Sequence, residues 1–134
     1  MKQDKRKLKK AVWLVFSRYI RLRDCLATTG TTTHGKCFTC PAILPIQKLQ
    51  AGHFIAGRRN ANLFSKKGCH AQCRRCNYLD GNPLEYRRQI IKMYGEGYDE
   101  ILENEAKQVK QFTIEELEQM KDYYTAKVKA MEGL

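Results

Sequence analysis

The sequence predicts an α+β fold in which a small cysteine-rich finger is flanked by one helix before it and several helices after it. Two Cys-x-x-Cys pairs, Cys37–Cys40 and Cys73–Cys76, are separated by 32 residues. Apolar residues recur at helical spacing in residues 1–28, and helix-start signals recur in residues 83–134. At 134 residues the chain has the length of one domain, so we expect residues 1–134 to form a single domain.

The N-terminal segment, residues 1–28, is expected to form a basic helix. Its apolar residues fall three or four positions apart, as on one face of a helix, and its basic residues mostly fall off that face. The apolar positions are Leu8, Val12, Val15, Tyr19, Leu22 and Leu26. The helix should end near Thr28–Gly30, where threonines and glycines accumulate.

Residues 35–81 are expected to form the finger. Gly35, Pro41 and Pro45 break this segment into short apolar pieces, which predicts a β-hairpin whose arms are residues 37–40 and 50–55. Residues 57–72 are expected to be an irregular basic loop. A short helix should then begin near Cys73 and stop at residues 80–83.

The remaining segment, residues 83–134, is expected to be helical. Pro83 suits the first turn of a helix, and a second helix is predicted over residues 97–109. Thr113 with Glu116 three residues later is a capping-box pattern, which predicts the start of the last helix.

The composition favours a cytoplasmic protein with reduced thiols. No apolar run approaches the roughly 18–20 residues that cross a bilayer, and the basic N-terminus lacks the features of a signal peptide. In the cytoplasm six cysteines are more consistent with metal ligands than with disulfides.

The distribution of charge favours a polyanionic partner. Residues 1–80 contain seventeen Lys and Arg against three Asp and Glu, a balance of +14, whereas residues 81–134 contain eight against eleven, a balance of −3. A surface of one sign repels itself and is tolerated where a polyanion binds. A solubilising basic face is the alternative, and a membrane surface is disfavoured because the middle segment has no amphipathic helical repeat. The candidate DNA contacts are Arg58, Arg59, Lys66, Lys67, Arg74 and Arg75.

The two Cys-x-x-Cys pairs predict a structural zinc ion bound by Cys37, Cys40, Cys73 and Cys76. Two residues between cysteines let both thiolates face one ion, and four thiolates complete a tetrahedral shell that leaves no position for water. Cys69 is close enough in sequence to compete as a ligand. A thioredoxin-like redox role is disfavoured, because one such pair would suffice and no βαβ pattern surrounds either pair.

A zinc ion at this position would draw His53, on the strand leaving the hairpin, toward Asn77, which directly follows the last zinc cysteine. In this respect the sequence resembles the HNH (ββα-metal) nucleases, which are built on a treble-clef zinc finger. That resemblance implies a strand histidine as general base, here His53, and a helix Asn or His that holds a catalytic divalent ion, here Asn77.

The sequence is also similar to the phage lambda NinG (Rap) family of recombination endonucleases over nearly its whole length. The matching stretches are Phe16-Ser-Arg-Tyr-Ile-Arg-Leu-Arg-Asp24, Ala51-Gly-His-Phe54, Cys69-His-Ala-Gln-Cys73, Arg75-Cys-Asn77, Gly81-Asn82, Tyr86-Arg87 and Tyr123-Tyr124-Thr-Ala-Lys127. The resemblance implies cleavage of branched DNA, such as D-loops and four-way junctions, during phage recombination in the host cytoplasm.

The chemistry of phosphodiester hydrolysis is consistent with these residues. Neutral His53 can deprotonate water near pH 7, and Mg²⁺ or Mn²⁺ bound by oxygen ligands can stabilise the charge on the phosphate. Asn77 offers one oxygen, and Asp80, three residues later, is expected on the same helical face as a second ligand. His70 is expected in a supporting role or as a phosphate contact.

Two departures from the family patterns stand out. Many HNH sites have an acidic residue before the base histidine, where this chain has Gly52. NinG members commonly have an Asn where this chain has Gly68, so we expect Asn60 or Asn62 to fix the loop instead.

Two rival functions remain open at this point: a zinc module that binds nucleic acid without cutting it, and a scaffold in a phage recombination or packaging complex. Because a four-way junction is two-fold symmetric, a homodimer would suit the nuclease. The apolar stripes of residues 8–26 and 113–131 would supply either its interface or the core.

Overall fold

The fold is a mixture of helices and two small sheets in the computed structural model, which describes residues 4–57 and 59–134. In chain order the elements are α1 (Lys5–Thr29), β1 (His34–Lys36), β2 (Ile43–Pro45), the 3-10 helix η1 (Ile46–Lys48), β3 (Leu49–His53), α2 (Asn60–Leu63), β4 (Cys69–Cys73), α3 (Arg74–Tyr78), α4 (Pro83–Tyr94), α5 (Tyr98–Ala106) and α6 (Ile114–Glu132). The α+β class is therefore confirmed.

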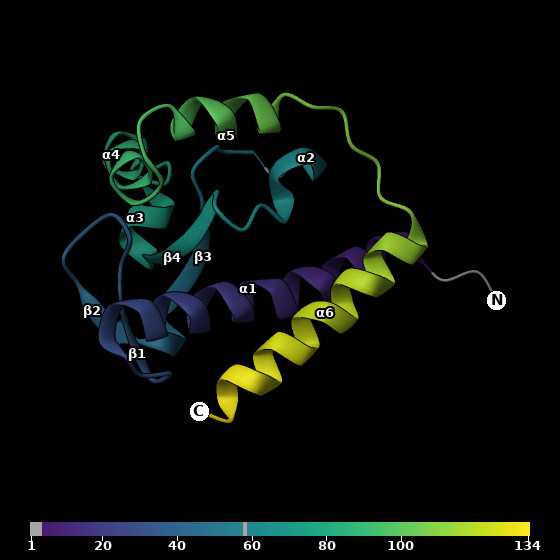
Figure 1. Cartoon of the computed structure of the whole chain (residues 1–134), viewed down its shortest axis with the longest axis horizontal. Coiled ribbons are helices and arrows are strands. Elements are labelled where there is room, and N and C mark those ends of the chain that lie inside the picture. Colours follow the sequence, from purple (N-terminus) through teal and green to yellow (C-terminus); the bar gives the residue numbers. More distant parts are fainter. Residues whose placement is uncertain (1–3, 58) are drawn as a thin grey trace.

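Helices α1 and α6 lie side by side and form one long edge of the molecule (Figure 1). The Asp4 side chain caps the start of α1, and Gly30 ends it in the left-handed conformation at φ 74°. The predicted capping box of Thr113 and Glu116 is present at the start of α6. Both predicted apolar stripes are buried within the chain: Phe16 and Tyr19 of α1 pack against Tyr124 of α6.

The predicted hairpin is wrong in its pairing. The first Cys-x-x-Cys pair lies in the turn between β1 and β2, which pair with each other antiparallel. The predicted second arm is β3, which pairs instead with β4 in a separate two-stranded sheet that aligns His53 with Cys69 and Leu49 with Cys73. The chain thus runs from a cysteine turn through a β3–β4 hairpin directly into α3.

Strand β4 occupies part of the segment predicted to be an irregular loop. Its polar residues His70 and Gln72 make the sequence resemble a loop, but all five residues of the strand are buried. One face of β4 joins the core against α1 through Cys69 and Ala71, while His70 and Gln72 face the other side and find polar partners there. Burial on both faces removes the alternation by which a strand is usually recognised.

Helices α3, α4 and α5 cover the end of the molecule that contains the β3–β4 hairpin (Figure 1). Pro83 is the first residue of α4, as predicted, while α5 ends at Ala106 and so is shorter than the predicted range 97–109. None of the described helices combines the length and the apolar character that crossing a bilayer requires.

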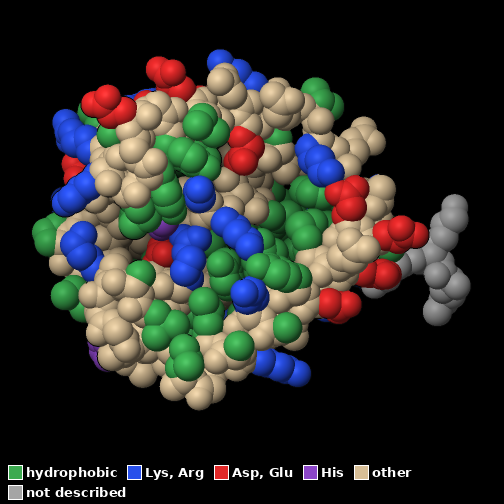
Figure 2. All heavy atoms as spheres, viewed as in Figure 1, with side chains coloured by type: hydrophobic (Ala, Val, Ile, Leu, Met, Phe, Trp, Pro, Cys, Tyr) green, Lys and Arg blue, Asp and Glu red, His purple; other side chains and the backbone are tan. Residues whose placement is uncertain are grey.

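On the face seen in Figure 2, Lys and Arg side chains gather near the centre, beside a hollow lined by apolar side chains. The hollow corresponds to a groove of about 630 Å³ bounded by α2, the α5–α6 connection and α6. Its lining includes the buried Phe112 and the exposed Tyr123.

Candidate functional site

The four cysteines of the two pairs form one cluster whose sulfur atoms all lie within 4.8 Å of one another. Cys37 and Cys40 come from the turn after β1, Cys73 ends β4, and Cys76 lies in α3. The sulfurs of Cys40 and Cys73 are 3.8 Å apart. A tetrahedral zinc ion with Zn–S bonds of about 2.3 Å separates its sulfurs by about 3.8 Å. The cluster therefore has the composition and spacing to hold a zinc ion, as predicted.

Backbone geometry prepares these sulfurs for a positive ion. The backbone N–H of Cys73 donates to the sulfur of Cys37 at 3.2 Å, and that of Cys76 donates to the sulfur of Cys73 at 3.4 Å. Burial opposes ionisation of Cys37, but the N–H groups of Cys73 and Thr39 that donate to its sulfur lower its pKa to about 7. Burial and neighbouring sulfurs raise the pKa of Cys40 to about 12.

The two remaining cysteines lie outside this cluster. Cys69 belongs to the apolar core between the β3–β4 hairpin and α1, so it does not compete for the ion. Cys25 is fully buried in the same core and is therefore an ordinary apolar core residue.

His53, at the end of β3, is held in a defined orientation. Its ring stacks on Trp13 of α1 with ring centres 5.3 Å apart, and its Nε2 lies 3.0 Å from the carbonyl oxygen of Leu63. A carbonyl can only accept a hydrogen bond, so Nε2 is the protonated nitrogen in this contact. In the neutral ring, Nδ1 is then the nitrogen with the lone pair that a general base needs.

Of the two asparagines proposed to fix the loop, Asn62 has the suitable position. It is buried, directly precedes Leu63, and donates from Nδ2 to the carbonyl oxygen of Ile55 at 3.1 Å. This bond ties α2 to the chain just beyond β3 and so fixes the carbonyl that orients His53. Asn60 instead contacts Lys9 and the backbone of Lys110.

Asn77 lies on α3 and shares one cleft with His53. The amide nitrogen of Asn77 donates to Gln50 Oε1 at 2.7 Å, which leaves its Oδ1 directed toward Gly52. The cleft has a volume of about 460 Å³ and follows β3 between α1 and α3. It is lined by Trp13, Ser17, Arg21, Leu49, Gln50, Ala51, His53 and Asn77.

Arg21 is a cleft residue that the predicted set of DNA contacts did not include. Its Nε donates to the backbone oxygen of Ser17 at 3.2 Å, and within the described residues its two terminal nitrogens have no hydrogen-bond partner. Burial, followed by the charge of nearby Arg18, lowers the pKa of Arg21. A guanidinium in this setting is a favourable position for an anion, and no carboxylate is among the described residues that line the cleft.

A second basic groove continues from the cleft along α1. It shares Trp13 with the cleft and is lined by Arg6, Lys9 and Lys10 among others. In the sequence, residues 6, 10, 13, 17 and 21 repeat at three- to four-residue spacing, which marks one helical face beside the apolar stripe. That periodicity is the signal that could have located both grooves.

Asp80 does not lie where its spacing predicted. Helix α3 ends at Tyr78, and Asp80, Gly81 and Asn82 all have positive φ values, of 53°, 78° and 54°. Asp80 is therefore exposed in a left-handed turn and does not share a helical face with Asn77, nor does it line the cleft.

His70 is also outside the cleft, because it pairs with Gly52 and so lies on the opposite face of the sheet from His53. Only 2% of it is exposed, and its ring stacks on Phe38 with centres 3.9 Å apart. Its Nδ1 lies 3.0 Å from Asp24 Oδ2, and its Nε2 lies 2.9 Å from the Tyr94 hydroxyl. His70 is therefore too enclosed to contact a phosphate directly.

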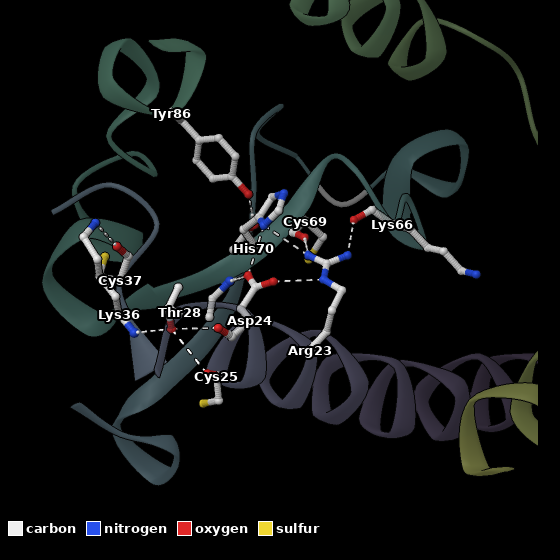
Figure 3. Close-up of polar contacts among 12 residues, drawn as sticks. Arg23, Asp24, Cys25, Thr28, Lys36, Cys37, Lys66, Cys69, His70 and Tyr86 are labelled. Atoms are coloured by element: carbon white, nitrogen blue, oxygen red, sulfur yellow. Dashed lines mark hydrogen bonds and ion pairs between the residues drawn. The ribbon is translucent and has the colours of Figure 1, made fainter. Parts of the chain in front are cut away.

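The His70 contacts belong to a polar network that joins α1 to β4 (Figure 3). Asp24 accepts from the backbone N–H of Ala71 at 2.7 Å and from Arg23 Nε at 2.9 Å, and Arg23 also donates to the carbonyl oxygens of Lys66 and Cys69. Burial opposes the charge of Asp24, but its hydrogen bond and ion pair with His70 and the charge of Arg23 lower its pKa. Burial lowers the pKa of His70 despite Asp24.

The predicted DNA contacts are dispersed. Arg59, Arg74 and Arg75 are exposed, and Arg74 lies over the ring of Tyr78 at 5.0 Å. The two lysines pack against tyrosines instead: Lys66 Nζ is 2.9 Å from the Tyr123 hydroxyl, and Lys67 Nζ is 4.8 Å from the centre of the Tyr98 ring. Arg58 lies outside the described residues.

The sequence of the chain matches a known protein family. The sequence model of the family described as Bacteriophage Lambda NinG protein matches residues 1–133. No curated protein and no solved structure matches the chain.

Proposed function

Because the chain belongs to the bacteriophage lambda NinG family, we propose that it is a metal-dependent, structure-selective DNA endonuclease of phage recombination. Its substrates would be branched intermediates such as D-loops and Holliday junctions, and its reaction would be phosphodiester hydrolysis. The observation that supports the proposal best is the single cleft that contains both His53 and Asn77 next to the four-cysteine cluster.

The order of elements supports an HNH site on a treble-clef finger. A cysteine turn, the β3–β4 hairpin and helix α3 follow one another, and the cysteines hold the turn to the start of the helix. Zinc would act structurally, because four thiolates leave no coordination position for substrate. His53 leaves the hairpin and Asn77 follows Cys76, so the zinc ion would set the distance between the two sides of the cleft.

His53 would be the general base. Its Nε2 donates to the Leu63 carbonyl, so Nδ1 can take the proton from an attacking water, a contribution of roughly 10²–10⁴-fold. Arg21 would bind a non-bridging oxygen of the scissile phosphate, because it lines the same cleft and its terminal nitrogens have no hydrogen-bond partner in the described part of the chain. The basic groove beside Trp13 would position the flanking phosphates.

The cleft would bind a divalent ion, Mg²⁺ or Mn²⁺, only together with DNA. Asn77 Oδ1 is a suitable hard oxygen ligand, while the described lining residues provide no carboxylate. When bound, the ion would stabilise the negative charge that develops on the phosphate and the leaving oxygen. Asn77 would hold it, and most of the negative charge around it would come from the DNA.

The symmetry of a four-way junction favours a homodimer that cuts two strands. The stripes of α1 and α6 bury one another within the chain, so a dimer interface would use another surface. We place the activity in the cytoplasm of the host cell, where phage DNA recombines.

A non-catalytic DNA-binding zinc module is the second candidate, and the absence of a carboxylate from the described cleft lining favours it. The two functions separate in a cleavage assay. A labelled four-way junction, a D-loop and a linear duplex are incubated with Mg²⁺ or Mn²⁺ and with wild type, His53→Ala or the control His34→Ala, at equal zinc content. His34 is exposed at the first position of β1 and does not line the cleft.

Cleavage of branched DNA by wild type and His34→Ala, but not by His53→Ala, is the expected result. Binding of the junction by all three proteins without cleavage in either metal would replace the nuclease with the binding module.

A further inference from the structure

The groove beside Trp13 combines basic with apolar side chains. It has a volume of about 450 Å³ and is lined by Arg6, Lys9, Lys10, Trp13, Leu14 and Leu63. Three of these residues are cations, three are apolar, and no carboxylate is among the described residues that line the groove. Phosphates need only the cations, so the phosphate contacts proposed above give the apolar side chains no role.

Leu14 is the apolar side chain of the groove that water reaches most. It is 70% exposed, whereas Leu8 and Leu22 of the same helix are buried in the core. Lys10 and Arg18 lie four positions before and after it, so Leu14 has a cation one helical turn away on either side. An apolar surface between cations suits a ligand that is itself both apolar and anionic.

A nucleotide has this combination, because its base has an apolar face and its phosphate is negative. Sites for single-stranded nucleic acid pair cationic side chains, which contact the backbone, with side chains against which a base can stack. An apolar peptide would instead leave the three cations of the groove without partners. A second copy of the chain is disfavoured as well, since its net charge of +11 would be repelled by those cations.

Two residues join this groove to the cleft that contains His53. Trp13 lines both the groove and the cleft, and its ring stacks on that of His53 with centres 5.3 Å apart. Leu63 also lines the groove, and its carbonyl oxygen lies 3.0 Å from His53 Nε2. A ligand in the groove therefore adjoins both residues that orient His53, and neighbouring nucleotides of one strand can occupy the groove and the cleft.

We propose that the groove binds one unpaired base of the DNA beside the scissile phosphate, with Trp13, Leu14 and Leu63 against the base. This inference rests on the proposed function, since it names the feature of the substrate that the nuclease would recognise. In a linear duplex every base is stacked and paired, and extruding one costs free energy. The displaced strand of a D-loop has unpaired bases, and pairing and stacking are weakest at a branch point. The groove thus selects branched DNA without reading its sequence.

An abasic substrate separates the base from its phosphates. A forked duplex with two single-stranded arms is compared with a fork whose arms are abasic, so that both carry the same number of phosphates. Binding is measured by fluorescence anisotropy without Mg²⁺ or Mn²⁺, so that no cleavage takes place. The proteins are wild type, Leu14→Ala and the control Leu84→Ala, all at equal zinc content. Leu84 is 71% exposed on α4 and does not line the groove, so both substitutions shorten an exposed helical leucine.

Wild type and Leu84→Ala should bind the ordinary fork about tenfold more tightly than the abasic fork. Leu14→Ala should reduce this ratio by about threefold or more, while its affinity for the abasic fork stays that of wild type. Equal affinity of wild type for the two forks, or the same ratio for Leu14→Ala and Leu84→Ala, would overturn the proposal.

Trp13 reports on the groove in the unmodified protein, because it is the single tryptophan of the sequence. At saturation the ordinary fork should quench its emission more strongly than the abasic fork, whereas equal quenching would overturn the proposal. Emission that changes with protein concentration in the absence of DNA would assign the groove to a second copy of the chain instead.

Failure of the proposed function looks different from failure of this inference. If the function fails, the ordinary fork is still preferred over the abasic fork, but branched DNA stays uncut with Mg²⁺ or Mn²⁺. If branched DNA is cut and the two forks bind equally, only the base site in the groove is wrong.

Discussion

The Asp24–His70–Arg23 network should be among the most sensitive points of the fold. Asp24 is 8% exposed and accepts three hydrogen bonds, from His70, Arg23 and the backbone of Ala71. Asp24→Asn keeps the shape of the side chain but replaces one acceptor oxygen by an NH₂ group. Whichever way the amide is oriented, its nitrogen then faces a donor, and the Arg23 guanidinium loses its counter-ion.

The expected cost can be estimated from this geometry. Removing one partner of a buried ion pair costs about 3–5 kcal/mol, because the remaining charge stays desolvated. The Arg23 side chain is still 22% exposed and keeps its bonds to two carbonyl oxygens, which places this pair at the low end of the range. We therefore expect Asp24→Asn to lower the free energy of unfolding by about 3 kcal/mol.

Urea unfolding followed by circular dichroism measures this difference. Free zinc is held constant with a metal buffer, because a bound metal otherwise makes the apparent stability depend on its concentration. Asp122→Asn, the same substitution at an exposed position of α6, is the control and should change the free energy of unfolding by no more than about 0.5 kcal/mol. A difference below about 1 kcal/mol for Asp24→Asn would show that the network contributes little and would refute the reasoning.

Three further predictions follow from the cleft, the cysteines and His70. Arg21→Ala should remove about one phosphate contact, so the slope of log K for junction binding against log salt should fall by about 0.9, whereas exposed Lys121→Ala should leave it unchanged; anisotropy titrations at several salt concentrations decide this. Cys76→Ser should lose zinc and cooperative unfolding together, and a zinc-free variant that unfolds cooperatively at the wild-type midpoint would contradict a structural site. Stability should fall as the pH drops below 6.5, because burial holds the pKa of His70 under that ordinary value and the unfolded chain then binds a proton that the folded chain does not. The loss should approach about 1.4 kcal/mol per pH unit at most, and His70→Gln should show a shallower decline in urea unfolding; equal slopes would exclude His70 as the cause.

Local chemistry made much of this fold predictable. Two residues between cysteines restrict the directions in which the thiolates can point. The spacing of the pairs at 37–40 and 73–76 was therefore enough to predict the four-cysteine cluster. Likewise Thr113 with Glu116 forms its capping box within four consecutive residues, and Pro83 starts α4 through its fixed φ. In each case the determining interaction is short in sequence.

The pairing of β3 with β4 was not predictable in this way, because its stabilising contacts are distant in sequence. His70 finds Asp24 across 46 residues, and Gln72 finds Thr39 across 33. Without those partners, two polar residues in a five-residue segment indicate a loop. The predicted position of Asp80 was wrong for a related reason. The spacing argument assumed that the helix continues to Asp80, but the left-handed turn at residues 80–82 does not allow this.

The charges around the cleft also fix the order in which ligands should bind. Arg21 lines the cleft together with His53 and Asn77, and the described lining includes no carboxylate, so a free divalent ion would meet the positive charge of Arg21 and only uncharged polar groups such as Asn77. A phosphate meets the reverse situation, since Arg21 attracts it and nothing negative in the lining opposes it. Once bound, the phosphate neutralises Arg21 and contributes its own oxygens to the ion. Phosphate and ion must then strengthen each other's binding by the same factor, because coupling between two ligands is reciprocal. Under the proposed function, such a cleft would make binding of the divalent ion depend on DNA, and that dependence would restrict hydrolysis to the complex in which a phosphate already lies beside His53.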